Sequence, residues 1–274
     1  MASHRRGLFP EPVAAKVPEI TLLFWVIKIL TTAGGEATSD YLALYHGRVE
    51  AGVIEAGLFL IALICQFRTR RYIAFAYWFL AYAIAIFGTG VADAMHLFIG
   101  IPYAGTTALW AVVLAAVFWL WYRSERTLSI HSIVTRRREI YYWCVVFATF
   151  AEGTALGDFT ATPLHLGYLA SGIMFFFVIL IPLVAWRGFK LNSVVAFWFA
   201  YVITRPLGAS FADYFSKPHS ISGANYGDGP VALYTTIIVF MLVTYLAVTR
   251  RDIQRPPDAE AERPATVNND VVGR

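Results

Sequence analysis

The chain has 274 residues, of which 58% are hydrophobic and only 15% are charged. An ordinary soluble domain carries about a quarter charged residues, so this composition excludes that class. The formal net charge of +4 does not indicate nucleic-acid binding, because the basic residues are grouped in short clusters between apolar stretches.

Eight apolar stretches predict an all-α integral membrane protein, since a helix of about 20 residues crosses the roughly 30 Å hydrocarbon layer. They lie near residues 20–42, 50–67, 73–97, 103–122, 140–161, 165–186, 194–215 and 230–249. They form two four-helix halves, residues 20–122 and 140–249, joined by a linker at residues 123–139.

Basic clusters fall on every second connection and on both termini. They contain Arg5 and Arg6, then Arg68, Arg70 and Arg71, then Arg123 with Arg136, Arg137 and Arg138, then Arg187 and Lys190, and finally Arg250 and Arg251. By the positive-inside rule, residues 1–19, the linker and residues 250–274 are cytoplasmic. The last of these segments is polar and proline-rich, which predicts a disordered tail.

An internal repeat occurs four times. Each copy begins with Phe-Trp or Tyr-Trp, has a glycine ten residues after the tryptophan, and has an aspartate fifteen residues after it. The tryptophans are Trp25, Trp78, Trp143 and Trp198, the glycines are Gly35, Gly88, Gly153 and Gly208, and the aspartates are Asp40, Asp93, Asp158 and Asp213. Each repeat spans two helices, so all copies share one orientation, which predicts pseudo-fourfold symmetry about the membrane normal.

The spacing within the repeat predicts close packing and a ring of acids. The glycine and the small residue before the aspartate form a pair that lets helices approach closely in lipid. Fifteen residues of helix rise about 22 Å, so the four aspartates lie at one depth near the outer edge of the membrane. Such a ring attracts cations, although an acid near a bilayer edge can also simply be solvated.

Further oxygen and nitrogen ligands accompany the aspartates. Residues four positions before an aspartate share its helix face, and three of these carry oxygen: Glu36, Thr89 and Thr154. Each outward connection also has a histidine: His46, His96, His165 and His219. Carboxylate with imidazole suits a divalent ion such as Mn²⁺, Fe²⁺ or Zn²⁺, or a proton relay, but loop histidines are also common without any ligand.

Four other charges inside the predicted spans break the repeat symmetry: Glu55, Glu152, Lys28 and Arg205. An unpaired charge in hydrocarbon is costly, so Lys28 and Arg205 are interpreted as counter-ions of the carboxylates, with substrate binding or proton coupling as the alternative. Glu55 and Glu152 offer a route for protons.

Three segments, KVPEITLLFWVIKILTTAGGEATSDYL, TALGDF and TRPLGASFADYFSKP, resemble a bacterial family of uncharacterised membrane-anchored proteins. The resemblance extends from Lys16 to Arg251 and implies a multi-spanning protein of the bacterial inner membrane. Gly157-Asp158 is also weakly similar to the Golgi type of manganese exchanger, whose motif has a glutamate two residues before Gly-Asp. Here the nearest acid is Glu152, five residues before Gly157, so the exchangers serve only as an analogy.

These patterns favour a transporter or channel for a cation, most simply a divalent metal such as manganese, with the lipid bilayer as its environment. The aspartates would bind the ion, and a bound divalent cation is the one cofactor the pattern allows. A membrane-embedded metal-dependent hydrolase is less favoured, because one catalytic site needs no fourfold copying. A non-transporting scaffold or binding protein is the third alternative, and a homo-oligomer is compatible with each of the three.

Overall fold

The structure, a computed structural model, describes residues 9–254, which contain eight long helices and no β-strand. The helices are α1 (Leu22–His46), α2 (Arg48–Arg68), α3 (Ala74–Leu97), α4 (Tyr103–Glu125), α5 (Arg136–Ala161), α6 (Gly167–Phe189), α7 (Ser193–Ser216) and α8 (Asp228–Thr249). Two short 3-10 helices, η1 (Ile130–Ser132) and η2 (His219–Ile221), lie in connections. The helices coincide with the eight apolar stretches to within a few residues, so the all-helical prediction is confirmed.

Polar side chains define where three helices begin. The Thr21 hydroxyl accepts a hydrogen bond from the Phe24 amide, and the Thr135 hydroxyl accepts one from Arg138. The side-chain oxygen of Asn192 caps α7 in the same way. Because the first amides of a helix have no partner within it, these caps determine the starts of α1, α5 and α7.

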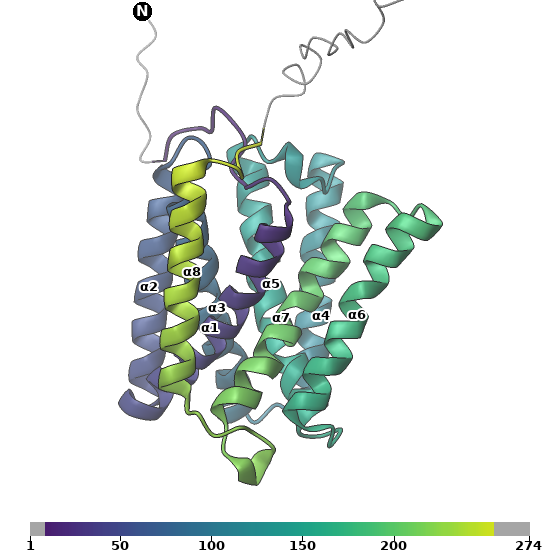
Figure 1. Cartoon of the computed structure of the whole chain (residues 1–274). Coiled ribbons are helices and arrows are strands. Elements are labelled where there is room, and N and C mark those ends of the chain that lie inside the picture. Colours follow the sequence, from purple (N-terminus) through teal and green to yellow (C-terminus); the bar gives the residue numbers. More distant parts are fainter. Residues whose placement is uncertain (1–8, 255–274) are drawn as a thin grey trace, which may run out of the picture.

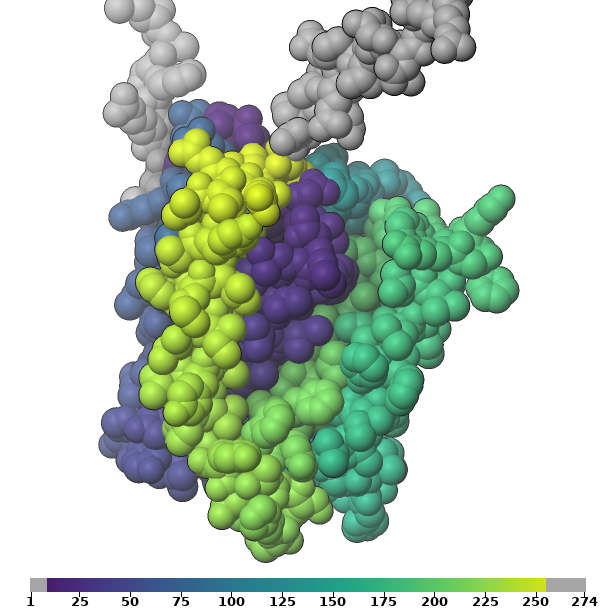
Figure 2. All heavy atoms as spheres, viewed as in Figure 1, coloured from purple at the N-terminus to yellow at the C-terminus, as the bar shows by residue number. Residues whose placement is uncertain are grey.

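The odd-numbered helices form an inner bundle. α1 contacts α3, α3 contacts α5, α5 contacts α7, and α7 returns to α1. Each even-numbered helix packs mainly on the next odd-numbered one: α2 on α3, α4 on α5, α6 on α7, and α8 on α1. On the face seen in Figures 1 and 2, α8 (yellow) and α7 (green) flank the purple α1, and α6 lies beyond α7. The two predicted halves thus meet along α4–α5, α1–α8, α1–α7 and α3–α5.

Six of the described helices, all except α1 and α5, are long and apolar enough to cross a membrane. In the most apolar 18-residue stretch of each helix, 61% of the residues are buried in α3 and 56% in α7, but only 22% in α2, α4, α6 and α8. The outer helices therefore expose apolar surface suited to lipid. α1 and α5 belong to the inner bundle and contain polar and ionisable residues that lower their hydropathy, so the crossing of all eight helices stays a prediction.

Each repeat glycine lies against the following inner helix. A Cβ atom added to any of them would come within 3.0 Å of a side chain on the neighbour. The pairs are Gly35 with Ala85, Gly88 with Phe150, Gly153 with Arg205, and Gly208 with Thr32. The four contacted residues occupy one equivalent position, seven residues after the repeat tryptophan. The same contact thus recurs at all four junctions of the inner bundle.

The segment before α1 crosses the end of the bundle where the described chain also finishes. Lys16 is fully buried there, with its ammonium 3.1 Å from Glu139 and 2.9 Å from the carbonyl oxygen of Gln66. Burial lowers the pKa of Lys16, although Glu139 opposes the change. The backbone amide of Glu19 donates to the carbonyl of Asp252, which joins this segment to the residues after α8. Arg5, Arg6 and residues 255–274, including the predicted tail, lie outside the described residues.

The glycine contacts predict that a glycine-to-alanine substitution destabilises the protein inside the inner bundle but not on an outer helix. Gly208→Ala would drive a methyl group into Thr32 and to 2.9 Å from the carbonyl oxygen of Ile29, so the inner helices must separate. Overpacking of this kind costs about 1–3 kcal/mol, and we expect a lower melting temperature for the detergent-solubilised protein. Gly57→Ala on α2 is the matched control, because nothing lies within 4 Å of the added methyl group. Equal melting temperatures for the two variants would contradict the packing argument.

Candidate functional site

Arg205, on α7, lies at the centre of the inner bundle with no exposed surface. Its guanidinium forms an ion pair with Glu36 of α1 and donates to the hydroxyls of Thr89 on α3 and Thr154 on α5. It also donates to the carbonyl oxygens of Thr32 and Phe150, at 2.9 and 3.3 Å. Each of the three guanidinium nitrogens therefore has at least one acceptor, and these contacts compensate the burial of the charge.

The residues four positions before the aspartates therefore meet around one cation. Glu36, Thr89 and Thr154 are each at most 3% exposed. The equivalent residue in the fourth repeat is Ala209, which offers no oxygen, and Arg205 lies one helical turn before it. The three oxygen-bearing residues predicted as cation ligands are thus engaged with the guanidinium.

A cluster of three carboxylates lies beside this centre. Glu36, Asp40 and Asp213 each offer an oxygen within 4.8 Å of the other two. Asp213 is buried, and Asp40 is half-buried. The cluster joins α1 to α7, so it includes two of the four repeat aspartates.

Lys217 sits within hydrogen-bonding distance of this cluster. Its ammonium lies 2.5 Å from Asp40, 3.3 Å from Asp228 and 3.8 Å from Asp213. Burial alone lowers the pKa of Lys217, but the three carboxylates outweigh it and raise that pKa well above its ordinary value. Lys217 is therefore a tethered cation that neutralises acids from three segments of the chain.

Neither Lys217 nor Asp228 was singled out from the sequence. A signal was present for the lysine, since it follows Asp213 by four residues and so shares its helix face. Asp228 opens α8 directly after Gly227, a residue with φ of 85°. Only the return of the chain across η2 brings that carboxylate to Lys217.

Asp93 and Asp158 are half-buried and lie outside the three-carboxylate cluster. Asp93 instead lines a cavity of about 550 Å³ between α1, α2 and α3, together with Asp40, Lys217 and Asp228. Asp158 lines neither feature. The structure thus places the repeat aspartates in different surroundings, although their positions in the sequence repeat are equivalent.

Glu55 of α2 also lines the cavity. It is 2% exposed, and one carboxylate oxygen accepts a hydrogen bond of 2.6 Å from Ser39. Its carboxyl group lies directly against Gly90 of α3, where an added Cβ atom would be 2.9 Å from the carboxyl carbon. A glycine at this position leaves the space that the Glu55 carboxylate occupies.

The four loop histidines belong to no group of three potential metal ligands among the described residues. His46, His165 and His219 are exposed. His96 stacks on Tyr103, with 3.8 Å between ring centroids, and its Nδ1 lies 2.9 Å from the carbonyl oxygen of Ile101. The Nδ1 atom of His219 is likewise 2.7 Å from the carbonyl oxygen of Gly223. Two of the four therefore make contacts within their own connections.

Two further charges are buried without a hydrogen-bond partner among the described residues. The Lys28 ammonium lies 4.1 Å from the ring centroid of Phe150 and 4.3 Å from that of Tyr201. A positive charge over an aromatic face is stabilised by the ring quadrupole. The Oε2 atom of Glu152 is the second such group.

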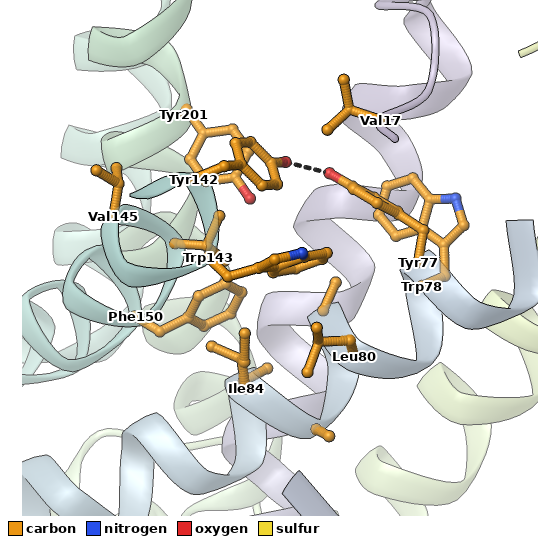
Figure 3. Packing of buried hydrophobic residues seen from close by; sticks show 14 of the residues in the cluster. Val17, Tyr77, Trp78, Leu80, Ile84, Tyr142, Trp143, Val145, Phe150 and Tyr201 are labelled. Atoms are coloured by element: carbon orange, nitrogen blue, oxygen red, sulfur yellow. Dashed lines mark hydrogen bonds between the residues drawn. The ribbon is translucent and has the colours of Figure 1, made fainter. Parts of the chain in front are cut away.

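Aromatic residues fill the end of the inner bundle that the N-terminal segment covers. Figure 3 shows the hydroxyl groups of Tyr77 and Tyr142 joined by a hydrogen bond, with Tyr201 beside them and Val17 facing them. All four side chains are at most 2% exposed. This end is closed by close packing, whereas the carboxylate cavity lies at the opposite ends of α1 and α3.

A family model matches the chain four times, at residues 23–72, 76–127, 141–191 and 196–252, which together are most of its length. The chain belongs to the family described as Repeat of Unknown Function (DUF347). Each match begins just before a repeat tryptophan and contains one inner and one outer helix, so the predicted fourfold repeat is confirmed. Comparison with the curated proteins and with the solved structures found no match.

We expect Arg205 and Glu36 of this DUF347 protein to be strongly coupled in their effects on stability, because they form a buried ion pair. Arg205→Met should leave Glu36 as a buried charge without a counter-ion and cost about 3–5 kcal/mol of unfolding free energy. Arg205→Met combined with Glu36→Met should recover much of that loss, because neither charge then remains. Thermal unfolding of the four purified forms measures the coupling, and losses that simply add would contradict it.

Proposed function

We propose that this protein is a membrane transporter for a cation, with a divalent metal such as manganese as its substrate. The proposal rests on the cluster of Glu36, Asp40 and Asp213, whose oxygens lie within 4.8 Å of one another. Asp40 also lines the 550 Å³ cavity, so the cluster can be reached from that cavity. Carboxylates gathered in a membrane-embedded bundle are costly unless they serve an ion pathway or have partners.

The ligand chemistry favours a hard cation. The cluster offers only carboxylate oxygens, and oxygen ligands suit Mg²⁺, Ca²⁺ and Mn²⁺. Imidazole would favour Zn²⁺ or Cu²⁺, but the loop histidines lie outside the cluster. Glu36, Asp40 and Asp213 would therefore be the ligands, and His46, His96, His165 and His219 would at most influence ions approaching from solution.

Lys217 suggests how an ion is taken up. Its ammonium already occupies a position 2.5 Å from Asp40 and 3.8 Å from Asp213. A divalent cation entering the cavity would replace this single positive charge with two, and Lys217 would turn toward Asp228. The repulsion among the acids is thus relieved in both states, by the lysine when the ion is absent and by the ion when it is bound.

A carrier fits this arrangement better than an open pore. Beyond the cluster, the path toward the other end is filled by the Arg205 guanidinium and then by the aromatic residues around Tyr142. A site that is open from one end at a time is the arrangement that alternating access requires. Glu55 in the cavity and Glu152 deeper in α5 are the candidate proton carriers for coupled transport.

The membrane setting is part of the same proposal. We place all eight helices across the inner membrane of a bacterium, with pseudo-fourfold symmetry about the membrane normal and both termini in the cytoplasm. The recurring glycine contacts support the symmetry, and the alternation of basic connections supports the orientation. The carboxylate cavity then faces the periplasm.

Variants of the cluster should change Mn²⁺ binding in opposite directions. Asp40→Asn and Asp213→Asn keep the side-chain shape but remove a charged ligand, so we expect the Mn²⁺ concentration needed for thermal stabilisation to rise about tenfold or more. Lys217→Met removes the competing ammonium and should lower that concentration. Mn²⁺ flux into liposomes should fall in both asparagine variants.

His165→Gln is the matched control, because this exposed side chain lies outside the cluster and should leave binding and flux unchanged. If Mn²⁺ stabilises every variant like the wild type and flux is unchanged, the aspartates are structural. Metal binding without flux would instead favour a scaffold, and metal-dependent lipid turnover would favour a hydrolase.

A further inference from the structure

A second cavity, of about 410 Å³, lies at the end of the bundle that the N-terminal segment covers. Three parts of the chain line it: residues 14–17, the connection into α3 with residues 71–74, and the end of α8 with the residues that follow it. It shares no lining residue with the carboxylate cavity. The two cavities also differ in charge: several carboxylates line the first, whereas two arginines and a single acid line the second.

Arg71 and Arg250 provide the positive charge of this cavity. Both side chains are exposed, and neither forms an ion pair with a carboxylate of the described residues. The one acid in the lining is Asp252, which accepts a hydrogen bond from the hydroxyl of Tyr72. Burial raises the pKa of Asp252, although that hydrogen bond opposes the change. The free hydrogen-bonding capacity of the cavity is therefore mainly that of two guanidinium groups.

Most of the remaining residues that line the cavity are apolar. Ile73 on one side and Leu246 with Ala247 on the other come from the adjacent ends of α3 and α8. Further along these two helices, Phe75 and Phe240 pack with 6.0 Å between ring centroids, and they are 43% and 63% exposed. A cationic cavity thus adjoins an apolar surface formed by the same helix pair.

We propose that this cavity binds the headgroup of an anionic phospholipid, with Arg71 and Arg250 holding the phosphate. The acyl chains would lie on the surface that Phe75 and Phe240 form between α3 and α8. Basic pockets between membrane helices select anionic headgroups, because guanidinium groups bind phosphate oxygens in pairs. A free phosphate ion would use the two arginines but would gain nothing from the apolar surface beside them.

The proposed lipid also contacts the N-terminal segment, since Ala14, Ala15 and Val17 form part of the cavity wall. Val17 is 2% exposed and packs in the core over the tyrosines. A bound lipid would therefore brace the segment that closes this end of the bundle. This inference does not depend on the identity of the transported cation.

Thermal unfolding of the full chain in a neutral detergent tests the proposal. Phosphatidylglycerol should raise the melting temperature, while phosphatidylcholine with the same acyl chains and inorganic phosphate should not. Arg71→Gln and Arg250→Gln should each weaken the phosphatidylglycerol affinity about fivefold, the loss expected for one basic residue near a lipid surface. The double variant should lose most of the stabilisation.

Lys190→Gln is the matched control, because Lys190 is an exposed basic residue at the end of α6 and does not line the cavity. Native mass spectrometry provides a readout independent of stability, in which the wild type should retain one more phosphatidylglycerol molecule than the double variant. Equal phosphatidylglycerol binding by the wild type and the double variant would overturn the proposal. Equal stabilisation by inorganic phosphate would overturn the assignment to lipid.

Discussion

The Arg205 guanidinium is the interaction on which the inner bundle depends, because it contacts all the helices that meet there. It extends from α7 to Glu36 of α1, Thr89 of α3 and Thr154 of α5. A buried charge is tolerated only when its donors are satisfied, so these contacts constrain the relative positions of the four helices. Gly153 makes room for it, since a methyl group there would collide with the arginine side chain.

The repeats share a skeleton but differ in their chemistry. The repeat glycine and the residue seven positions after the tryptophan make the same helix contact at each of the four junctions. At that second position the chain has Thr32, Ala85, Phe150 and Arg205, so only one repeat supplies a cation. The position four residues before the aspartate likewise supplies a single acid, Glu36. The four repeats therefore pack in the same way, but among the described residues only one charged pair, Arg205 with Glu36, forms at the centre of the bundle.

This asymmetry separates the two ends of the inner bundle. At one end, Lys217 links Asp40, Asp213 and Asp228 beside the larger cavity. At the other, Val17 packs on buried tyrosines, and Lys16 pairs with Glu139 beneath the surface. Acids reachable from a cavity can exchange their counter-ion, whereas the buried tyrosines at the other end line neither of the two cavities described above. The proposed transport requires this difference, because a carrier must close one side of its site while the other is open.

The helices and the repeat followed from the sequence alone. Apolar stretches of bilayer length and the spacing of Trp78, Gly88 and Asp93 are local properties, so they identified the helical segments and the repeated unit. The close contacts of the glycines were also predictable, since a missing side chain has its main effect where two helices touch. The hydropathy pattern could not determine which helices are neighbours, because that depends on how the inner helices are arranged around the bundle.

Only the tertiary structure decided the partners of the charged groups. Arg205 and Glu36 are 169 residues apart, and Lys217 and Asp40 are 177 apart, so no local pattern relates them. Equivalent positions in the sequence suggested one ring of aspartates, but the structure gathers Asp40 and Asp213 with Glu36 and leaves Asp93 and Asp158 outside that cluster. The physical reason is that helix propensity and hydropathy act within a segment, whereas the pairing of buried charges depends on the side chains that all neighbouring helices bring to the same place.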